Sequence, residues 1–144
     1  MLVVFKKIET SINLIFYASR EILTNNSKIP IKYNDLYRDL EYHNIREPDV
    51  RLILVNEQHG AQYLPGIYYG KIRLFQDNYK DQFIEKLGLH GHRLNNLIFG
   101  RCGDLVYTQR YPQSNIEEET NYQQLLRIIM TVAKNKQACH KMCG

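Results

Sequence analysis

The sequence of 144 residues has no tryptophan, only three cysteines and four prolines, and no long run of apolar residues. The cysteines, Cys102, Cys139 and Cys143, are odd in number and do not have the spacing of a disulfide framework, which favours a reducing compartment. The apolar runs at residues 2–5 and 12–16 are too short for a membrane-spanning helix, and the first has the wrong order of charge for a secretion signal. These absences predict a soluble, intracellular protein of the cytoplasm or nucleus.

The composition is that of an ordinary folded protein. Hydrophobic residues make up 44% of the chain and charged residues 24%, and a chain of this length can bury a core without disulfides or metal. We therefore expect a single domain over residues 1–138, followed by a short C-terminal tail at residues 139–144. The net charge of +4 at pH 7 permits an anionic partner but does not require one.

The spacing of apolar residues predicts a mixture of strands and helices. Short β-branched or alternating runs indicate strands, whereas apolar residues that recur at helical spacing indicate amphipathic helices. Strands are predicted at residues 2–5, 50–55, 66–75 and 105–108, and helices at residues 9–23, 34–40 and 116–134. The predicted fold class is α+β: a single compact domain with a small, mostly antiparallel sheet and about four to five helices.

Residues 80–99 read KDQFIEKLGLHGHRLNNLIF and predict two short helices that meet at Gly88. Glycine suits a sharp turn between helices, and apolar positions on either side of it would form an inward face. The apolar positions are Phe83, Leu87, Leu89, Leu94 and Leu97. The polar side chains that would face outward are His92, Arg93, Asn95 and Asn96. A second helix with such a face can present polar groups to a major groove.

This segment resembles the helix-turn-helix of Cro and repressor-type DNA-binding proteins, over about 20 of the 144 residues and into the following Gly100 and Arg101. The resemblance implies a small, basic regulatory protein that binds DNA or RNA. In that role Arg93 would read guanine, Asn95 or Asn96 would read adenine, and His92 would lie beside them. The residues that would neutralise phosphates are Lys80, Lys86 and Arg101. Basic residues also outnumber acidic ones between residues 71 and 110.

Two alternatives to nucleic-acid binding stay open at this point. Residues 80–99 can be an ordinary helical hairpin that packs on the sheet. The protein can also be a non-catalytic protein–protein interaction module, such as a viral or phage accessory protein that binds a host factor. That function would need an exposed apolar patch, for which the sequence offers Tyr63, Tyr68 and Tyr69.

Metal and catalytic sites are not predicted. Two sets of metal-ligating side chains occur, but neither matches a paired zinc framework. The sets are His90, His92 and Cys102, and Cys139, His140 and Cys143. Asp49, Glu57 and His59 lie around one strand, but a nuclease would need lysine where His59 stands, and Asp49 is typical of a turn. Cys102 has no histidine placed near it by local spacing, as a catalytic thiol would need. We therefore expect no enzyme activity, no metal and no cofactor.

Overall fold

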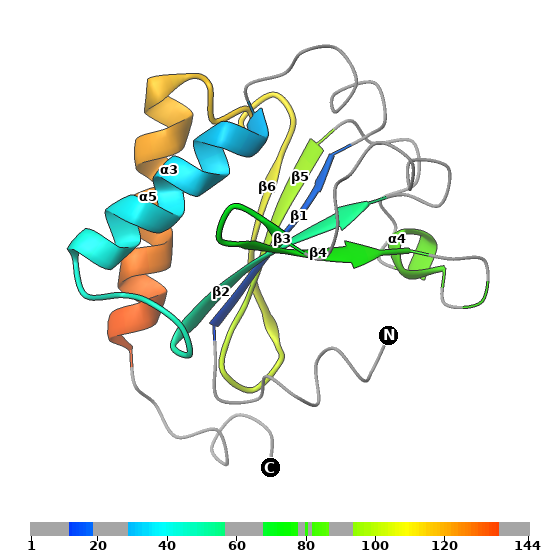
Figure 1. The fold of residues 1–144 in the computed structure, drawn as a ribbon, viewed down its shortest axis with the longest axis horizontal. Coiled ribbons are helices and arrows are strands. Elements are labelled where there is room, and N and C mark those ends of the chain that lie inside the picture. The colour runs from blue at the N-terminus through cyan, green and yellow to red at the C-terminus, as the bar shows by residue number, and fades with distance from the viewer. Residues whose placement is uncertain are drawn as a thin grey trace.

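The computed structural model describes residues 12–18, 29–56, 68–77, 80, 82–86 and 94–135 (Figure 1). The strands in these residues are β1 (Ile12–Ala18), β2 (Val50–Asn56), β3 (Tyr68–Tyr69), β4 (Ile72–Gln76), β5 (Leu94–Phe99) and β6 (Leu105–Arg110). The helices are α3 (Ile29–Tyr42), the single-turn α4 (Phe83–Lys86) and α5 (Glu119–Lys134).

The strands form one six-stranded mixed sheet in the order β3-β4-β2-β1-β5-β6. The central strands β1, β2 and β4 run parallel to one another. On one side β5 and β6 continue the sheet with antiparallel pairing, and on the other side β3 forms a hairpin with β4. The domain is α+β as predicted, but the expected mostly antiparallel sheet with four to five helices is wrong. Among the described residues, two long helices and the short α4 accompany a mixed sheet.

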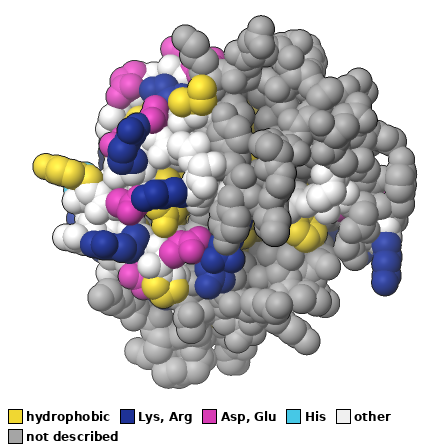
Figure 2. All heavy atoms as spheres, in the orientation of Figure 1, with side chains coloured by type: hydrophobic (Ala, Val, Ile, Leu, Met, Phe, Trp, Pro, Cys, Tyr) yellow, Lys and Arg dark blue, Asp and Glu magenta, His cyan; other side chains and the backbone are white. Residues whose placement is uncertain are grey.

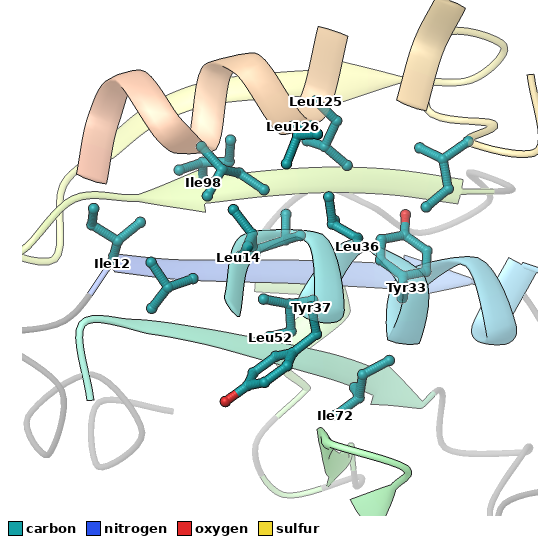
Figure 3. Packing of buried hydrophobic residues seen from close by; sticks show 14 of the residues in the cluster. Ile12, Leu14, Tyr33, Leu36, Tyr37, Leu52, Ile72, Ile98, Leu125 and Leu126 are labelled. Atoms are coloured by element: carbon teal, nitrogen blue, oxygen red, sulfur yellow. The ribbon is translucent and has the colours of Figure 1, made fainter. Parts of the chain in front are cut away.

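Both long helices pack against the same face of the sheet (Figure 1). Figure 3 shows side chains of β1, β2 and β5 meeting those of α3 and α5 in one core. The fully buried members of this core include Leu14, Tyr33, Leu52, Ile98 and Leu125. Burial of this apolar surface, at roughly 25 cal/mol per Å², holds the helices to the sheet. Side chains on the opposite sheet face are buried too, among them Ile15, Val55 and Leu97, so both faces of the central strands are covered.

The N-terminal amphipathic helix predicted at residues 9–23 is wrong where the structure describes the chain, because residues 12–18 form strand β1. Ile12, Leu14 and Ile15 are all buried, on two opposite faces. A strand in the middle of a parallel sheet is buried on both faces and therefore carries a near-continuous apolar run rather than an alternating one. Such a short run also fits one face of a helix, which explains the error.

Several locally patterned elements were predicted correctly. The predicted strand at 50–55 is β2, and the predicted strand at 105–108 is the start of β6. The predicted helix at 34–40 lies inside α3, which begins earlier, at Ile29. The helix predicted at 116–134 is α5, which begins at Glu119, and its buried residues are Tyr122, Leu125, Leu126, Ile129 and Ala133.

The single strand predicted at residues 66–75 is a tight hairpin over its described part. The chain turns at Gly70 and Lys71, between β3 and β4. Gly70 has a φ of +60°, and a Cβ there would lie 2.2 Å from Oδ1 of Asn34. The same Asn34 oxygen accepts a hydrogen bond from the Lys71 backbone N–H at 3.1 Å. Glycine is therefore required because α3 touches the turn at this point.

The two-helix unit predicted at residues 80–99 is also wrong. Phe83–Lys86 make one helical turn, but Leu94–Phe99, the expected second helix, form strand β5 between β1 and β6. All six residues of β5 are buried. The sequence LNNLIF of β5 fits one face of a helix as well as it fits a fully buried strand. The strand forms because these residues pair with β1 and β6.

Other predictions fall partly or wholly outside the described residues. These are the strand at residues 2–5, Tyr63, Glu57 and His59, and the proposed boundary between residues 138 and 139. No helix in the described part of the chain is long and apolar enough to cross a membrane.

Candidate functional site

The two asparagines expected to read bases lie inside the sheet. Asn95 and Asn96 are 1% and 0% exposed, in the strand that separates β1 from β6. Successive side chains of a strand point to opposite faces, so the two amides enter different layers of the protein. Neither side chain can reach the edge of a base, and the contacts predicted for them are wrong.

Asn96 is the centre of a buried hydrogen-bond network on the helical face of the sheet. Its Oδ1 accepts a hydrogen bond from the Tyr33 hydroxyl of α3. Its Nδ2 donates to Oε1 of Gln109 at 2.8 Å and to the Ser114 carbonyl at 3.4 Å. Ser114 in turn donates from Oγ to the Leu94 carbonyl at 2.9 Å. Burial raises the pKa of Tyr33 far above its usual range, although the bond to Asn96 partly opposes this shift. The network therefore joins α3, β5 and β6 as a structural unit.

Asn95 has the opposite environment. Among the described residues, neither Nδ2 nor Oδ1 of Asn95 has a hydrogen-bond partner, although both atoms are buried. Its register partners are Tyr17 in β1 and Arg110 in β6. Burial of an amide costs free energy, and no hydrogen bond within the described part of the chain offsets that cost at Asn95.

The residues predicted to contact phosphates belong to different parts of the fold. Lys80 is exposed in a turn and Lys86 is exposed at the end of α4, whereas His92 and Arg93 lie outside the described residues. Arg101 is half-buried, and its guanidinium donates to backbone carbonyls at the end of α5. The roles of these residues depended on a helix-turn-helix, and they are withdrawn with it.

The basic excess seen in the sequence around residues 71–110 is partly neutralised by acids from other elements. Lys71 Nζ lies 2.5 Å from Oε1 of Glu41 in α3. Arg73 makes two bonds to Glu47, at 2.9 and 3.0 Å, and this ion pair lowers the pKa of the Glu47 carboxyl. Figure 2 shows lysine and arginine interspersed with aspartate and glutamate over the described part of this face. The described residues in that view form no continuous basic surface of the kind that a phosphate backbone needs.

Cysteine occurs at only one of the two ends of the central strands, among the described residues. The carboxyl ends of the parallel strands, at Ala18, Asn56 and Gln76, lie together at one edge, where open α/β sheets commonly bind their ligands. No cysteine occurs before residue 102, so none is supplied from the segment that follows β1. Cys102 belongs to the turn between β5 and β6, at the opposite edge, about 20 Å away along the strands.

The turn that carries Cys102 is held by backbone hydrogen bonds. The Gly100 N–H donates to the Asp104 carbonyl at 2.8 Å, and the Gly103 N–H donates to the Gly100 carbonyl at 3.0 Å. Gly103 has a φ of +80°, and a Cβ built there would meet no atom of the described chain within 4 Å. Cys102 is a half-buried thiol between these glycines. The backbone on both sides of Cys102 is thus held by hydrogen bonds, and the described residues leave space beside Gly103.

No metal site is formed by the described residues, which contain no group of three histidine, cysteine, aspartate or glutamate side chains able to hold an ion. Of the two sets of metal-ligating side chains in the sequence, only Cys102 is described. His90, His92, Cys139, His140 and Cys143 lie outside the described residues.

Comparison with known proteins identifies the fold class. No protein-family model and no curated protein matches the chain. Among solved structures, a thioredoxin-like protein from Porphyromonas gingivalis has a TM-score of 0.60 at 17% identity, covering 90% of this chain and 80% of that one. Thioredoxin peroxidase I of Plasmodium yoelii has a TM-score of 0.60 at 13% identity, covering 96% and 82%. BsSco, a member of the Sco family of cytochrome c oxidase assembly proteins with an identified disulfide switch, has a TM-score of 0.60 at 15% identity, covering 89% and 83%.

The fold is therefore thioredoxin-like, and the resemblance to Cro-type regulators is wrong. The predicted DNA or RNA partner depended on the helix-turn-helix and is wrong with it. The viral accessory role is wrong too, since the similar structures are described as a thioredoxin-like protein, a thioredoxin peroxidase and a Sco protein. The sequence signal that usually reveals such a protein is a Cys-x-x-Cys motif near a βαβ unit. This chain has none, since Cys139 and Cys143 are separated by three residues and follow the last helix. Cys102-Gly103-Asp104 is typical of a turn in the sequence, but only the structure places this turn between β5 and β6.

Proposed function

We propose that this chain takes part in thiol–disulfide exchange with protein partners, and that Cys102 is the thiol that forms the mixed disulfide. The observation that carries the proposal is the half-buried thiol in a turn held by backbone hydrogen bonds, on a thioredoxin-like fold. Two of the similar structures, a thioredoxin peroxidase and a Sco protein with a disulfide switch, support the same chemistry.

The exchange step needs a thiolate that can reach a disulfide sulfur. Sγ of Cys102, as the thiolate, attacks one sulfur of a partner's disulfide and forms a mixed disulfide. The second sulfur of the partner leaves as a thiolate and takes up a proton, so the numbers of electrons and atoms balance. The open space beside Gly103 leaves room for the partner chain on that side of the turn.

The proposed chemistry differs from that of a dithiol oxidoreductase. A Cys-x-x-Cys protein carries both thiols in one motif, and its second thiol resolves the mixed disulfide. Here the segment that follows the carboxyl end of β1 contains no cysteine, and the proposed reactive thiol lies at the opposite end of the strands. We therefore expect the chain to be a poor general reductant of disulfides, even though similar structures include an enzyme.

The proposal is tested with a variant in which Cys102 is the single cysteine, Cys139→Ser with Cys143→Ser. The folded variant is incubated with glutathione disulfide and with insulin, and the adducts are measured by intact mass and on non-reducing gels. We expect a mixed disulfide at Cys102 with both probes. The matched control, Cys102→Ser in the same background, should form none. A Cys102 thiol that reacts only after unfolding in urea would refute the proposal, because it would be inaccessible in the fold.

A further inference from the structure

Strand β6 is an edge of the sheet that begins close to Cys102. It is the last strand in the sheet order, so no strand of the described chain pairs with its outer side. In an edge strand, every second residue points its backbone N–H and C=O away from the sheet, where an extended segment of another chain can bond to them. The opposite edge strand, β3, has two residues, whereas β6 has six. The longer edge of the described sheet therefore lies beside the proposed reactive thiol.

The side chains of β6 do little to protect this edge from pairing. Natural edge strands commonly carry lysine, proline or inward-pointing charges that discourage an added strand. β6 reads LVYTQR and has a single charged residue, Arg110, at its end. Leu105 and Val106, at its start, are 53% and 41% exposed although both are large and apolar. The end of β6 nearest Cys102 thus offers an apolar contact, and the far end offers a positive charge.

A β-bulge limits which kind of chain this edge can accept. Tyr107 opposes Ile98 and Leu105 opposes Phe99, so Val106 is the extra residue of the bulge. A bulge twists an edge and hinders the flat pairing of two whole sheets, which disfavours a second copy of this protein. A short extended segment can bend with the strand. The bulge therefore favours a flexible segment of a partner protein over a second folded sheet.

We propose that β6 docks an extended segment of the partner protein, which pairs antiparallel with residues 107–110 and brings its disulfide to Cys102. The inference rests on the proposed exchange at Cys102 and names the chemistry of the partner. That exchange requires the partner chain to lie at the β5–β6 turn. Leu105 is three residues from Cys102, a separation of at most about 10 Å. A segment of ordinary strand length can thus bond to β6 and reach the thiol at the same time.

The charges around β6 determine the order of residues in the docked segment. Exposed Arg110 favours an acidic residue opposite it, since opposite charges across neighbouring strands attract. Leu105 and Val106 favour apolar residues closer to the partner's cysteine. Half-buried Asp104 disfavours an acidic residue at that end. Because the pairing is antiparallel, the segment carries an acidic residue first, then apolar residues, and then the cysteine of its disulfide.

The test measures how fast Cys102 attacks a synthetic peptide, in the full chain with Cys139→Ser and Cys143→Ser. The peptide has the length of residues 102–110, begins with glutamate, has valine and leucine opposite Leu105 and Val106, and ends with cysteine linked to thionitrobenzoate. Attack on the cysteine sulfur forms the Cys102–peptide disulfide and releases the coloured thionitrobenzoate anion. We expect this matched peptide to react about 10-fold faster than a scrambled peptide that keeps the same terminal cysteine.

Variants of β6 test the predicted contacts one at a time. Arg110→Glu should slow the reaction of the matched peptide about 5-fold, and it should accelerate a peptide in which lysine replaces the first glutamate. Leu105→Ser should reduce the preference for the matched over the scrambled peptide. Arg127→Glu makes the same charge change on the exposed side of α5 and should alter neither rate. Circular dichroism of each variant verifies that the fold is retained.

The outcomes separate this inference from the proposed function. Equal rates for the matched and scrambled peptides, with a normal glutathione adduct at Cys102, would overturn the docking and leave the exchange intact. An equal effect of Arg110→Glu on the glutamate and lysine peptides would also overturn it. A dimer in sedimentation velocity that Leu105→Ser dissociates would assign the edge to a second copy and overturn the docking as well. No reaction at Cys102 with glutathione disulfide or with either peptide would overturn both proposals together.

Discussion

The two adjacent asparagines of β5 should respond in opposite directions to the same substitution. Asn96 makes three hydrogen bonds inside the helical layer, whereas Asn95, on the other face, has no partner among the described residues. Leucine is close to asparagine in size and removes the amide in both cases. We therefore expect Asn96→Leu to lower the free energy of unfolding and Asn95→Leu to raise it.

The expected changes in the free energy of unfolding follow from the buried polar groups that each substitution affects. Asn96→Leu removes the hydrogen bonds of Asn96 to the Tyr33 hydroxyl and to Oε1 of Gln109, in residues that are 0% and 2% exposed. Removal of one partner of a buried hydrogen bond costs about 1–3 kcal/mol, so the expected loss is about 4 kcal/mol. Asn95→Leu replaces an amide with two unsatisfied atoms by an apolar side chain, and we expect a gain of about 1 kcal/mol.

The assay is urea unfolding at pH 7, monitored by circular dichroism, with the slope against urea checked for a constant m-value. The exposed Gln113→Ala serves as the control and should change the free energy of unfolding by less than about 0.5 kcal/mol. Burial of Asn96 in a hydrogen-bond network would be refuted if Asn96→Leu lowered the free energy of unfolding by less than about 1 kcal/mol. An asparagine on an exposed helix face would give such a small change. The opposite environments of the two asparagines would likewise be refuted if Asn95→Leu were the more destabilising of the two.

Three further comparisons test other contacts. Arg101→Ala removes the hydrogen bonds to the carbonyls at the end of α5 and should lower the Tm by about 5 °C in a thermal scan. Arg101→Lys lacks the forked guanidinium, so its Tm should lie between those of Arg101→Ala and the wild type. Arg73 lowers the pKa of Glu47, so their ion pair contributes stability above the unfolded carboxyl pKa of about 4.3 and loses it as pH falls through the lower folded pKa. The stability difference between wild type and Arg73→Ala should therefore shrink from pH 7 to pH 3 in urea titrations, and an equal difference at both values would contradict this account. Gly70→Ala combines a positive φ with a clash against Asn34, whereas Gly103→Ala has a positive φ in open space, so we expect the first to cost about 1–3 kcal/mol more, as measured by urea unfolding.

Local periodicity was enough to predict the elements whose side chains divide cleanly between core and solvent. In α5 the buried positions Tyr122, Leu125, Leu126 and Ile129 recur at helical spacing, and the polar positions between them are exposed. The β-branched run of β2 was likewise sufficient to predict a strand. These predictions succeeded because each pattern is complete within one element.

The errors at the predicted N-terminal helix and at residues 80–99 fall on β1 and β5, two inner strands of the sheet. Both are buried on two faces, and their short apolar runs fit a helix as well as a strand. Leu94, Asn96 and Ile98 face the helices while Leu97 and Phe99 face the other side, and this division exists only once β1 and β6 are paired with β5. The asparagines assigned to base recognition were misplaced for the same reason.

The sequence by itself determined the domain class α+β, helices α3 and α5, strands β2 and β6, and the absence of a Cys-x-x-Cys motif. These properties depend on composition and on contacts between residues close in the chain. Only the tertiary structure decided the mixed sheet, the burial of Asn95 and Asn96, and the place of Cys102 beside the end of α5. Those features arise from strand pairing and from an arginine contact across more than 30 residues, and no local pattern encodes such distant partners.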